Sequence, residues 1–473
     1  MNTARHSLNQ SKVCKNSLNL MLSQRSIIVA LTALITSFQA LNSLDAGENQ
    51  SWKAWLGDRA DSVWAQEERS LDLNSKPLRL AWKHELGSGY SGPSIDKDMV
   101  VVMDWHLDTG EKEPADVFDR GKLKGSEGIV CFNVETGKVR WQHRYPETYT
   151  ISYPAGPRTT PILSEKHVIA LGAEGRLSIL DKDNGNLIWE KDFKTAYQSK
   201  TPLWGFAGHP LLLNDTIICL VGGENNAGVV AFDLETGKEQ WRSLNFEEMG
   251  YAPPTLIERQ GKKELIIWSG DGIFSIDPQT GSSHWDIPWP LRFALSIPTP
   301  RQYNNLLYFT CFYNGSTLLD LKQDPPAVLW QTKKPSEKDT THLNSIMSTP
   351  FLHEGHIYGV CSYGQFRCLE TSSGKRLWET MEVTTGEEDK QERWANVFLI
   401  KNGPADRFLL FNESGDLIDC ELTPNGYTEL GRMHLIDPNG KDLRRRPIVW
   451  SHPALTQDVI CVRNDDSIAC YKF

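Results

Sequence analysis

A short segment recurs along the sequence at nearly even intervals, and this repetition constrains the fold more than any other feature. In the copy GVVAFDLETGKEQW (228–241), alternating apolar residues lead to an acidic residue, a Thr-Gly turn and a second run that ends in tryptophan. Successive terminal tryptophans are 44 to 52 residues apart, at Trp141, Trp189, Trp241, Trp285, Trp330 and Trp378. A strand–turn–strand unit with this period predicts the blades of a β-propeller.

A second hairpin precedes each copy, so each unit holds four strands. Proline is tolerated at the first residue of a strand, and it marks most of the hairpin starts. Eight starts can be counted, near Pro93, Pro161, Pro210, Pro254, Pro300, Pro350, Asn396 and Pro453. The sequence therefore predicts an all-β, eight-bladed β-propeller of four-stranded antiparallel blades. A seven-bladed ring with a spare hairpin is the alternative.

The two ends of the repeated region complement each other. The last unit ends at Phe473 without an outer strand, whereas residues 78–86 form an outer strand with Trp82 but have no inner strands before them. Pairing the two segments would close the ring and remove the exposed sheet edges that promote aggregation. We therefore expect strand 78–86 to complete the C-terminal blade.

The N-terminal region has the pattern of an export signal. Arg25 precedes an apolar stretch over 27–35, followed by small and polar residues up to Ala46. This stretch is shorter than the ~20 apolar residues of a membrane-spanning helix. We expect a signal peptide over residues 1–46, with Met21 as an alternative start, then a lead-in segment over 47–77 and the propeller over 78–473. We expect the protein to lie in the periplasm or to be secreted. It would be attached to a membrane only if the N-terminal segment stays uncleaved as an anchor.

The charge balance excludes one class of partner. The sequence has 50 Lys and Arg against 60 Asp and Glu, a net charge of −10. Nucleic-acid binding needs a concentrated basic surface, so we expect no nucleic-acid partner.

The nine cysteines predict buried thiols rather than disulfides. Cys131, Cys368 and Cys470 occupy the same position in the repeat, where other copies have Ile179, Ala231 and other small or apolar residues. A free cysteine behaves as a small hydrophobic side chain in such a core position.

The repeat A-F-D-x-x-T-G-K-x-x-W (231–241) resembles the tryptophan-docking repeat of the quinoprotein-like (PQQ-like, BamB-like) β-propeller family. The family includes quinone-dependent alcohol dehydrogenases and non-enzymatic members of the bacterial envelope. The resemblance implies that each tryptophan, Trp82 included, wedges between neighbouring blades. The lead-in over 52–68 is similar to the W-x-x-W-R-G-P opening of exported members, but it departs from that pattern at Leu56 and Asp58.

The loops that connect each outer strand to the next inner strand converge on the central channel, where a radial fold binds its ligands. These loops carry rings, cations and amides that suit stacking and cation–π contacts with a sugar, a peptide or a planar ligand. Alternatively, they pack together and plug the channel. The predicted binding residues are Tyr153, Arg158, Trp204, His209, Tyr251, Arg292, His342, Asn344, Trp394, Trp450 and His452.

The enzymatic family members imply a vicinal cysteine pair, a calcium site and an aspartate base. The sequence has no adjacent cysteines, and its candidate calcium ligands, Glu224 and Asn225, are far fewer than the six to eight oxygens that Ca²⁺ takes. We therefore expect a non-catalytic, monomeric binding or scaffold protein without a cofactor, with a protein or glycan partner in the cell envelope. A PQQ-dependent oxidoreductase with calcium and a divergent site, or a polysaccharide-recognition protein, are the alternatives.

Overall fold

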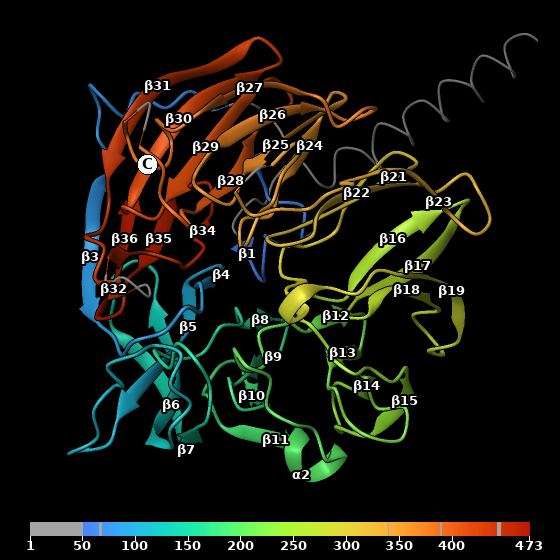
Figure 1. Cartoon of the computed structure of the whole chain (residues 1–473). Coiled ribbons are helices and arrows are strands. Elements are labelled where there is room, and N and C mark those ends of the chain that lie inside the picture. Colours follow the sequence, from blue (N-terminus) through green and yellow to red (C-terminus); the bar gives the residue numbers. More distant parts are fainter. Residues whose placement is uncertain (1–50, 66–68, 339, 388–389, 442–445) are drawn as a thin grey trace, which may run out of the picture. The chain divides into compact units, whose positions relative to one another are not determined.

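The computed structural model describes residues 51–65, 69–338, 340–387, 390–441 and 446–473. The predicted signal peptide, 1–46, lies outside these residues. Eight four-stranded antiparallel units are arranged radially about a common centre (Figure 1). The predicted all-β, eight-bladed β-propeller is confirmed, and the seven-bladed alternative is wrong.

The first four blades follow one another along the chain, and in each the innermost strand comes first. Blade 1 consists of β4 (Ser94–Asp96), β5 (Met99–Leu107), β6 (Leu123–Asn133) and β7 (Val139–Tyr149), and blade 2 of β8 (Ile162–Leu163), β9 (His167–Leu171), β10 (Arg176–Asp181) and β11 (Leu187–Asp192). Blade 3 consists of β12 (Leu211–Leu213), β13 (Thr216–Leu220), β14 (Val229–Asp233) and β15 (Glu239–Ser243). Blade 4 consists of β16 (Thr255–Arg259), β17 (Lys262–Trp268), β18 (Gly272–Ile276) and β19 (Ser283–Pro288).

Blades 5 to 7 repeat this order, and blade 8 takes its outer strand from the start of the ring. Blade 5 consists of β20 (Arg301–Tyr303), β21 (Leu306–Cys311), β22 (Gly315–Asp320) and β23 (Ala327–Gln331), and blade 6 of β24 (Phe351–His353), β25 (His356–Val360), β26 (Phe366–Glu370) and β27 (Arg376–Thr380). Blade 7 consists of β28 (Val397–Asn402), β29 (Arg407–Asn412), β30 (Asp416–Thr423) and β31 (Gly426–His434). Blade 8 consists of β34 (Ala454–Leu455), β35 (Val459–Arg463), β36 (Ser467–Lys472) and β3 (Arg79–Glu85).

The ring closes as predicted, because β3 pairs antiparallel with β36 and places Trp82 opposite Cys470. Strand pairing between the two ends of the propeller leaves no blade incomplete among the described residues. Closure of this kind protects the sheet edges that a linear array would expose.

Each docking tryptophan contacts the following blade, and five of the seven also donate a hydrogen bond to it. Trp141 Nε1 lies 2.9 Å from the Lys182 carbonyl oxygen. The glycine of the next blade's turn lies under the ring: a Cβ on Gly185, at φ +73°, would come within 2.4 Å of Trp141. The same donation to a backbone carbonyl is made by Trp82, Trp189, Trp330 and Trp378.

Trp241 and Trp285 depart from this pattern. The Trp241 Nε1 has no hydrogen-bond partner among the described residues, although the ring is buried over Gly281. Trp285 Nε1 instead donates to Glu264 of its own blade, at 2.9 Å. The ring contacts are therefore common to all blades, whereas the indole hydrogen bond is not.

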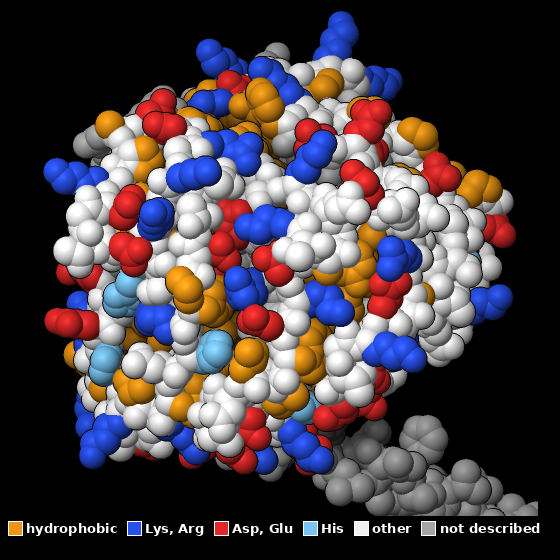
Figure 2. Space-filling view, turned by 90° about the horizontal axis from the view of Figure 1, so that it is seen from below, with side chains coloured by type: hydrophobic (Ala, Val, Ile, Leu, Met, Phe, Trp, Pro, Cys, Tyr) orange, Lys and Arg blue, Asp and Glu red, His pale blue; other side chains and the backbone are white. Residues whose placement is uncertain are grey.

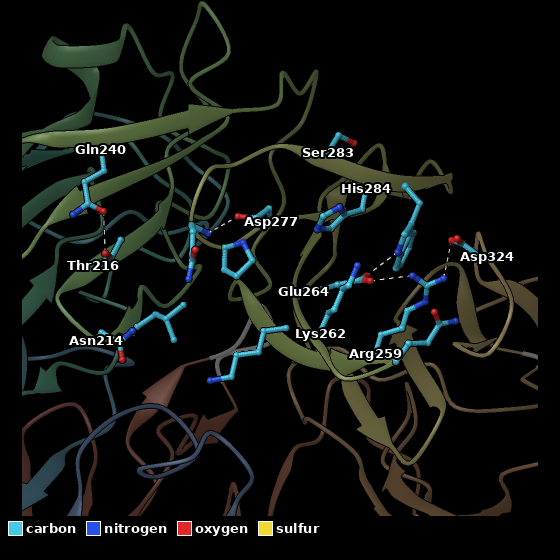
Figure 3. A pocket seen from close by; sticks show the side chains of 16 residues that line it. Asn214, Thr216, Gln240, Arg259, Lys262, Glu264, Asp277, Ser283, His284 and Asp324 are labelled. Carbon is cyan, nitrogen blue, oxygen red and sulfur yellow. Dashed lines mark hydrogen bonds and ion pairs between the residues drawn. The ribbon is translucent and has the colours of Figure 1, made fainter.

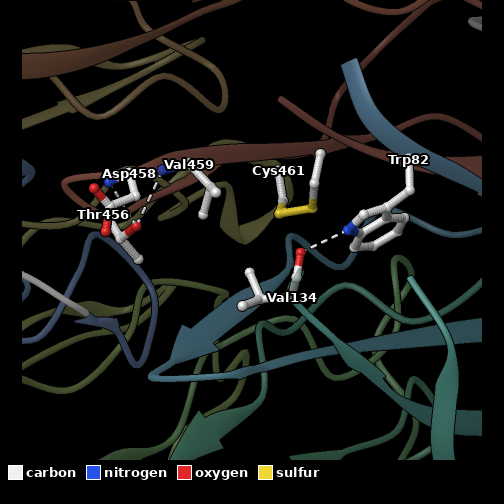
Figure 4. The surroundings of a disulfide bond; sticks show 7 residues. Trp82, Val134, Thr456, Asp458, Val459 and Cys461 are labelled. Atoms are coloured by element: carbon white, nitrogen blue, oxygen red, sulfur yellow. Dashed lines mark hydrogen bonds between the residues drawn. A yellow bond between two sulfur atoms is a disulfide. The ribbon is translucent and has the colours of Figure 1, made fainter. Parts of the chain in front are cut away.

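A disulfide joins Cys461 and Cys470, which are directly opposite each other on β35 and β36 (Figure 4). The prediction of a free thiol at Cys470 is wrong, because the strand register brings a second cysteine against it. The six other cysteines among the described residues are buried thiols, as predicted.

The lead-in segment adds two strands to the propeller. β1 (Ser51–Trp52) pairs with β4 of blade 1, and β2 (Val63–Ala65) pairs in parallel with β28 of blade 7. Between them the chain crosses the ring: the Lys53 carbonyl accepts from Leu163 N in blade 2, and Arg301 in blade 5 donates to the carbonyls of Ala60 and Asp61. This segment therefore ties blades on opposite sides of the channel together.

Little else interrupts the β-structure. The short segments α2 (Phe193–Tyr197), η1 (Arg292–Ala294) and the hairpin β32 (Gly440–Lys441) with β33 (Pro447–Ile448) lie in connections between strands. Within the described residues, no helix is long and apolar enough to span a bilayer. Figure 2 shows acidic and basic side chains mixed over one side of the molecule, with hydrophobic groups between them.

Candidate binding site on the funnel face

Seven of the eleven predicted binding residues line one pocket of about 200 Å³, which we call the aromatic pocket. The loops that end the outer strands bring these residues together from different blades. The seven are Tyr153, Arg158, Trp204, His209, Tyr251, Trp394 and Trp450.

Trp55 of the lead-in segment also lines the pocket. Its ring stacks on His209 with centroids 4.3 Å apart and planes 12° apart, and its Nε1 donates to Thr299 Oγ1 at 2.9 Å. Trp55 thus contacts the loops that lead into blades 3, 5 and 8, so the lead-in forms part of the pocket wall. Sequence reasoning assigned no role to this residue, although the W-x-x-W spacing was the available signal.

Further lining residues come from places that sequence reasoning did not associate with the channel. Tyr90 precedes the first inner strand, Phe118 lies in the long β5–β6 connection and Phe398 lies in β28. Phe118 packs edge-on against Tyr153, with centroids 5.3 Å apart. An insertion with no counterpart in the other blades therefore contributes to the pocket wall.

Two wall residues have backbones in the left-handed region, which non-glycine residues rarely occupy. Tyr153 has φ +54° and Trp394 has φ +67°. Their amides are fixed by backbone hydrogen bonds, Tyr153 N to the Val117 carbonyl and Trp394 N to the Ser362 carbonyl. Such conformations persist where the surroundings determine them, and they are often found at binding sites.

A buried carboxylate positions Trp450. Glu413 Oε2 accepts from Trp450 Nε1 at 3.0 Å, and Glu413 is also paired with Arg446. Burial raises the pKa of the Glu413 carboxyl, opposed by Arg446. The ion pair of Glu413 and Arg446 therefore fixes the orientation of the Trp450 ring.

Arg158 is the one cationic side chain among the described lining residues, and none of these residues has a carboxylate. The Arg158 guanidinium donates to the carbonyls of Ser152, at 2.9 Å, Tyr153, at 2.6 Å, and Gly156. It also lies over the Tyr90 ring, 5.3 Å from its centroid. Burial lowers the pKa of Arg158, but a guanidinium stays protonated in proteins.

The two histidines beneath the pocket are neutral. Burial lowers the pKa of His209 to about 3 and that of His452 to about 4. The Thr160 amide donates to His209 Nδ1, which therefore acts as an acceptor. The wall thus combines apolar rings, one fixed positive charge and an uncharged imidazole.

The other four predicted residues lie outside this pocket. Arg292 is exposed and covers the Tyr313 ring, 4.5 Å from its centroid. Asn344 is fully buried and donates to the Phe312 carbonyl. His452 lies behind Trp55, 5.3 Å between ring centroids.

His342 lies between blades 5 and 6 rather than on the channel. Its ring packs 4.7 Å from Trp330, and its Nδ1 is 2.9 Å from the Gly374 carbonyl oxygen. His342 therefore takes part in the contact between Trp330 and blade 6, away from the aromatic pocket. The long loop between β23 and β24 allows its side chain to fill this gap.

The donor set around the pocket does not fit a calcium-bound quinone. Glu224 and Asn225 are exposed in the β13–β14 turn and do not line the pocket. Calcium takes six to eight oxygen ligands, and the described lining residues supply neither a carboxylate nor a side-chain amide. A volume of about 200 Å³ is also below the roughly 300–1,000 Å³ of sites for larger ligands.

A second, polar pocket of about 1080 Å³ lies between blades 3 and 4 (Figure 3). Its charged centre is internally paired: Arg259 binds Glu264 at 2.9 Å and Asp324 at 2.8 Å. Burial opposes ionisation of Glu264, but hydrogen bonds from Ser275, Arg259 and Trp285 keep its pKa below the ordinary value. These groups stabilise the junction of blades 4 and 5, where Trp285 lacks a carbonyl partner.

One group of three candidate metal ligands occurs among the described residues, namely His353, Glu354 and Asp406. His353 Nε2 is 3.1 Å from Asp406 Oδ1, and Glu354 is exposed. The group lies on strand ends of blades 6 and 7 and is separate from the aromatic pocket.

Comparison with known proteins gives consistent matches. Residues 125–380 match the family model described as outer membrane protein assembly factor BamB. A protein of that description from Burkholderia pseudomallei (strain K96243) is 26% identical over 141 residues, 28% of this chain and 32% of the relative. Another from Alteromonas naphthalenivorans is 25% identical over 233 residues, 47% of this chain and 54% of the relative. The chain thus spans about half or less of the length of these relatives.

Solved structures share the fold at low identity. BamB from Moraxella catarrhalis superposes with a TM-score of 0.53 at 14% identity, covering 84% of this chain and 98% of that chain. A europium-containing methanol dehydrogenase superposes with a TM-score of 0.57 at 12% identity, covering 88% and 90%. BamB and a dehydrogenase both share this fold, so the fold alone does not determine the function.

Proposed function

Since the chain belongs to the family described as outer membrane protein assembly factor BamB, we propose that it is a non-catalytic scaffold of the bacterial envelope. In this role it binds a protein partner, after export to the periplasm, through the face that carries the aromatic pocket, which we call the funnel face. The names of the curated relatives support an envelope role, and their low coverage leaves the partner open.

The aromatic pocket is the observation that carries this proposal. Rings from several blades meet in one apolar cavity, and Trp204 and Tyr251 pack edge-on there with centroids 5.7 Å apart. Tyrosine, tryptophan and arginine are the side chains enriched where protein interfaces gain most of their affinity. A pocket of this size suits an anchoring side chain of a partner better than a cofactor with its metal.

Site-specific photo-crosslinking in the cells that express the chain tests this role. The probe p-benzoylphenylalanine replaces Phe293, which is 53% exposed and lies in the loop that supplies Leu295 to the pocket. A matched probe replaces Leu187, which is 41% exposed on the outer strand of blade 2. We expect a discrete envelope protein to crosslink at 293 and not at 187, and Trp204→Ala to weaken that product.

Equal crosslinking from both positions, or no effect of Trp204→Ala, would refute the proposal. Two further outcomes would replace it. Stoichiometric binding of PQQ with calcium, together with dye-linked alcohol oxidation, would make the chain an oxidoreductase. Glycan-array binding that Trp450→Ala abolishes would make it a polysaccharide-recognition protein.

A further inference from the structure

We propose that the aromatic pocket binds the carboxyl-terminal residue of a partner polypeptide, with the terminal carboxylate on Arg158 and an apolar side chain among the rings. This inference rests on the proposed function and specifies which part of the partner enters the pocket. It follows from the charge, the size and the polar groups of the pocket.

The positive charge of Arg158 has no acid partner among the described residues. Its three hydrogen bonds all go to backbone carbonyls, of Ser152, Tyr153 and Gly156. A guanidinium has five N–H groups, and three of these are used, which leaves two for a ligand. Carboxylates are the preferred partners of guanidinium groups because the two planar groups match in geometry.

Glu127 and Glu174 act on Arg158 electrostatically, but both carboxylates are hydrogen-bonded to other groups. Glu127 accepts from Tyr145, Tyr149 and the Ala173 amide. Glu174 binds Lys194 at 3.0 Å and also accepts from Thr150 and Thr201. A ligand carboxylate would therefore supply a counter-charge that the described chain does not place on Arg158.

The aromatic residues that line the rest of the pocket determine which side chain can accompany that carboxylate. The rings of Trp55, Trp204, Tyr251 and Trp450 leave about 200 Å³, which suits one large side chain. A chain end combines these two features, an apolar side chain and a carboxylate.

Binding of short peptides to the purified full chain tests the inference by titration calorimetry. The probes are Gly-Gly-Gly-Phe as the free acid, the same peptide as the C-terminal amide, and Gly-Gly-Gly-Ser as the free acid. We expect the phenylalanine acid to bind at least tenfold more tightly than either other peptide. Arg158→Gln should reduce the affinity for the acid tenfold or more and leave that for the amide unchanged.

Arg292→Gln is the matched control, because Arg292 is an exposed arginine of the same face outside the pocket. It should change neither affinity. If Arg158→Gln does not fold, the acid–amide comparison on the unaltered chain still decides. Equal affinity for acid and amide, equal affinity for the phenylalanine and serine acids, or no binding of any peptide overturns the inference. The crosslinking experiment tests the proposed function separately, because a partner can bind the funnel face without inserting its carboxyl terminus into the pocket.

Discussion

Replacing a docking tryptophan by phenylalanine should cost more stability at Trp141 than at Trp241. The two rings are almost equally buried, 7% and 8% exposed, and each covers a turn glycine of the next blade. They differ in one respect: Trp141 Nε1 donates to the Lys182 carbonyl at 2.9 Å, whereas Trp241 Nε1 has no partner among the described residues. The pair therefore isolates the hydrogen bond from the ring contact.

The expected difference follows from that bond. Both substitutions lose the same part of the indole ring, so their packing costs should be similar. Trp141→Phe also leaves a buried carbonyl without its donor, which costs about 1–3 kcal/mol. Trp241→Phe removes a buried N–H that has no hydrogen-bond partner. This removal is favourable and offsets part of the stability lost with the ring contacts. Trp141→Phe should thus be less stable than Trp241→Phe by at least about 1–3 kcal/mol.

Equilibrium unfolding in urea, followed by far-UV circular dichroism on the full chain, measures this difference without using tryptophan fluorescence. The free energies of unfolding of both variants are compared with that of the unaltered chain. Equal destabilisation, or a larger loss in Trp241→Phe, would refute the view that the indole hydrogen bond contributes to docking.

Three further predictions concern the ring and the channel. Gly185→Ala should lower the thermal midpoint more than Gly355→Ala: both glycines have positive φ, but only the first would place its Cβ against Trp141. Acidification should destabilise the fold between pH 6.5 and 4. The folded-state pKa values of His209 and His452, about 3 and 4, lie below the ordinary 6.5, so the unfolded chain takes up protons first. The loss is about 2 kcal/mol per histidine at pH 5, and His209→Gln should remove about half of it in urea titrations across this range. Finally, reducing the blade 8 disulfide, which closes a short loop, should cost about 2–3 kcal/mol of unfolding free energy, measured with and without reductant.

The ring could be predicted from the sequence because it is built from equivalent environments. Each docking tryptophan meets the same turn in the next blade, so the same residue types recur at the same spacing. Closure by β3 was predictable for the same reason, since Trp82 marks an outer strand without a blade of its own.

Contacts that occur once in the molecule could not be predicted in this way. The disulfide depends on the register that places Cys461 opposite Cys470, and spacing alone does not specify register. Trp55 reaches the pocket because its segment pairs with blades 1 and 7 and also contacts blades 2 and 5. His342 lies in a long loop, where its position in the sequence does not determine where its side chain points.

The candidate site could be predicted from the sequence only in part. Fold geometry indicates which loops face the channel, and seven of the eleven predicted residues line one pocket there. The lack of an ion pair for Arg158 among the described residues becomes visible only with the structure, which shows Glu127 and Glu174 bound to other groups.

Hydrogen–deuterium exchange of the full chain, with and without the partner captured by crosslinking at Phe293, tests the central claim most directly. If the funnel face receives the partner, the loops over 151–158, 202–209, 291–297 and 449–452 should be protected, and the outer strands should exchange as in the free chain. Protection confined to the outer strands, with unchanged exchange in these loops, would contradict the account.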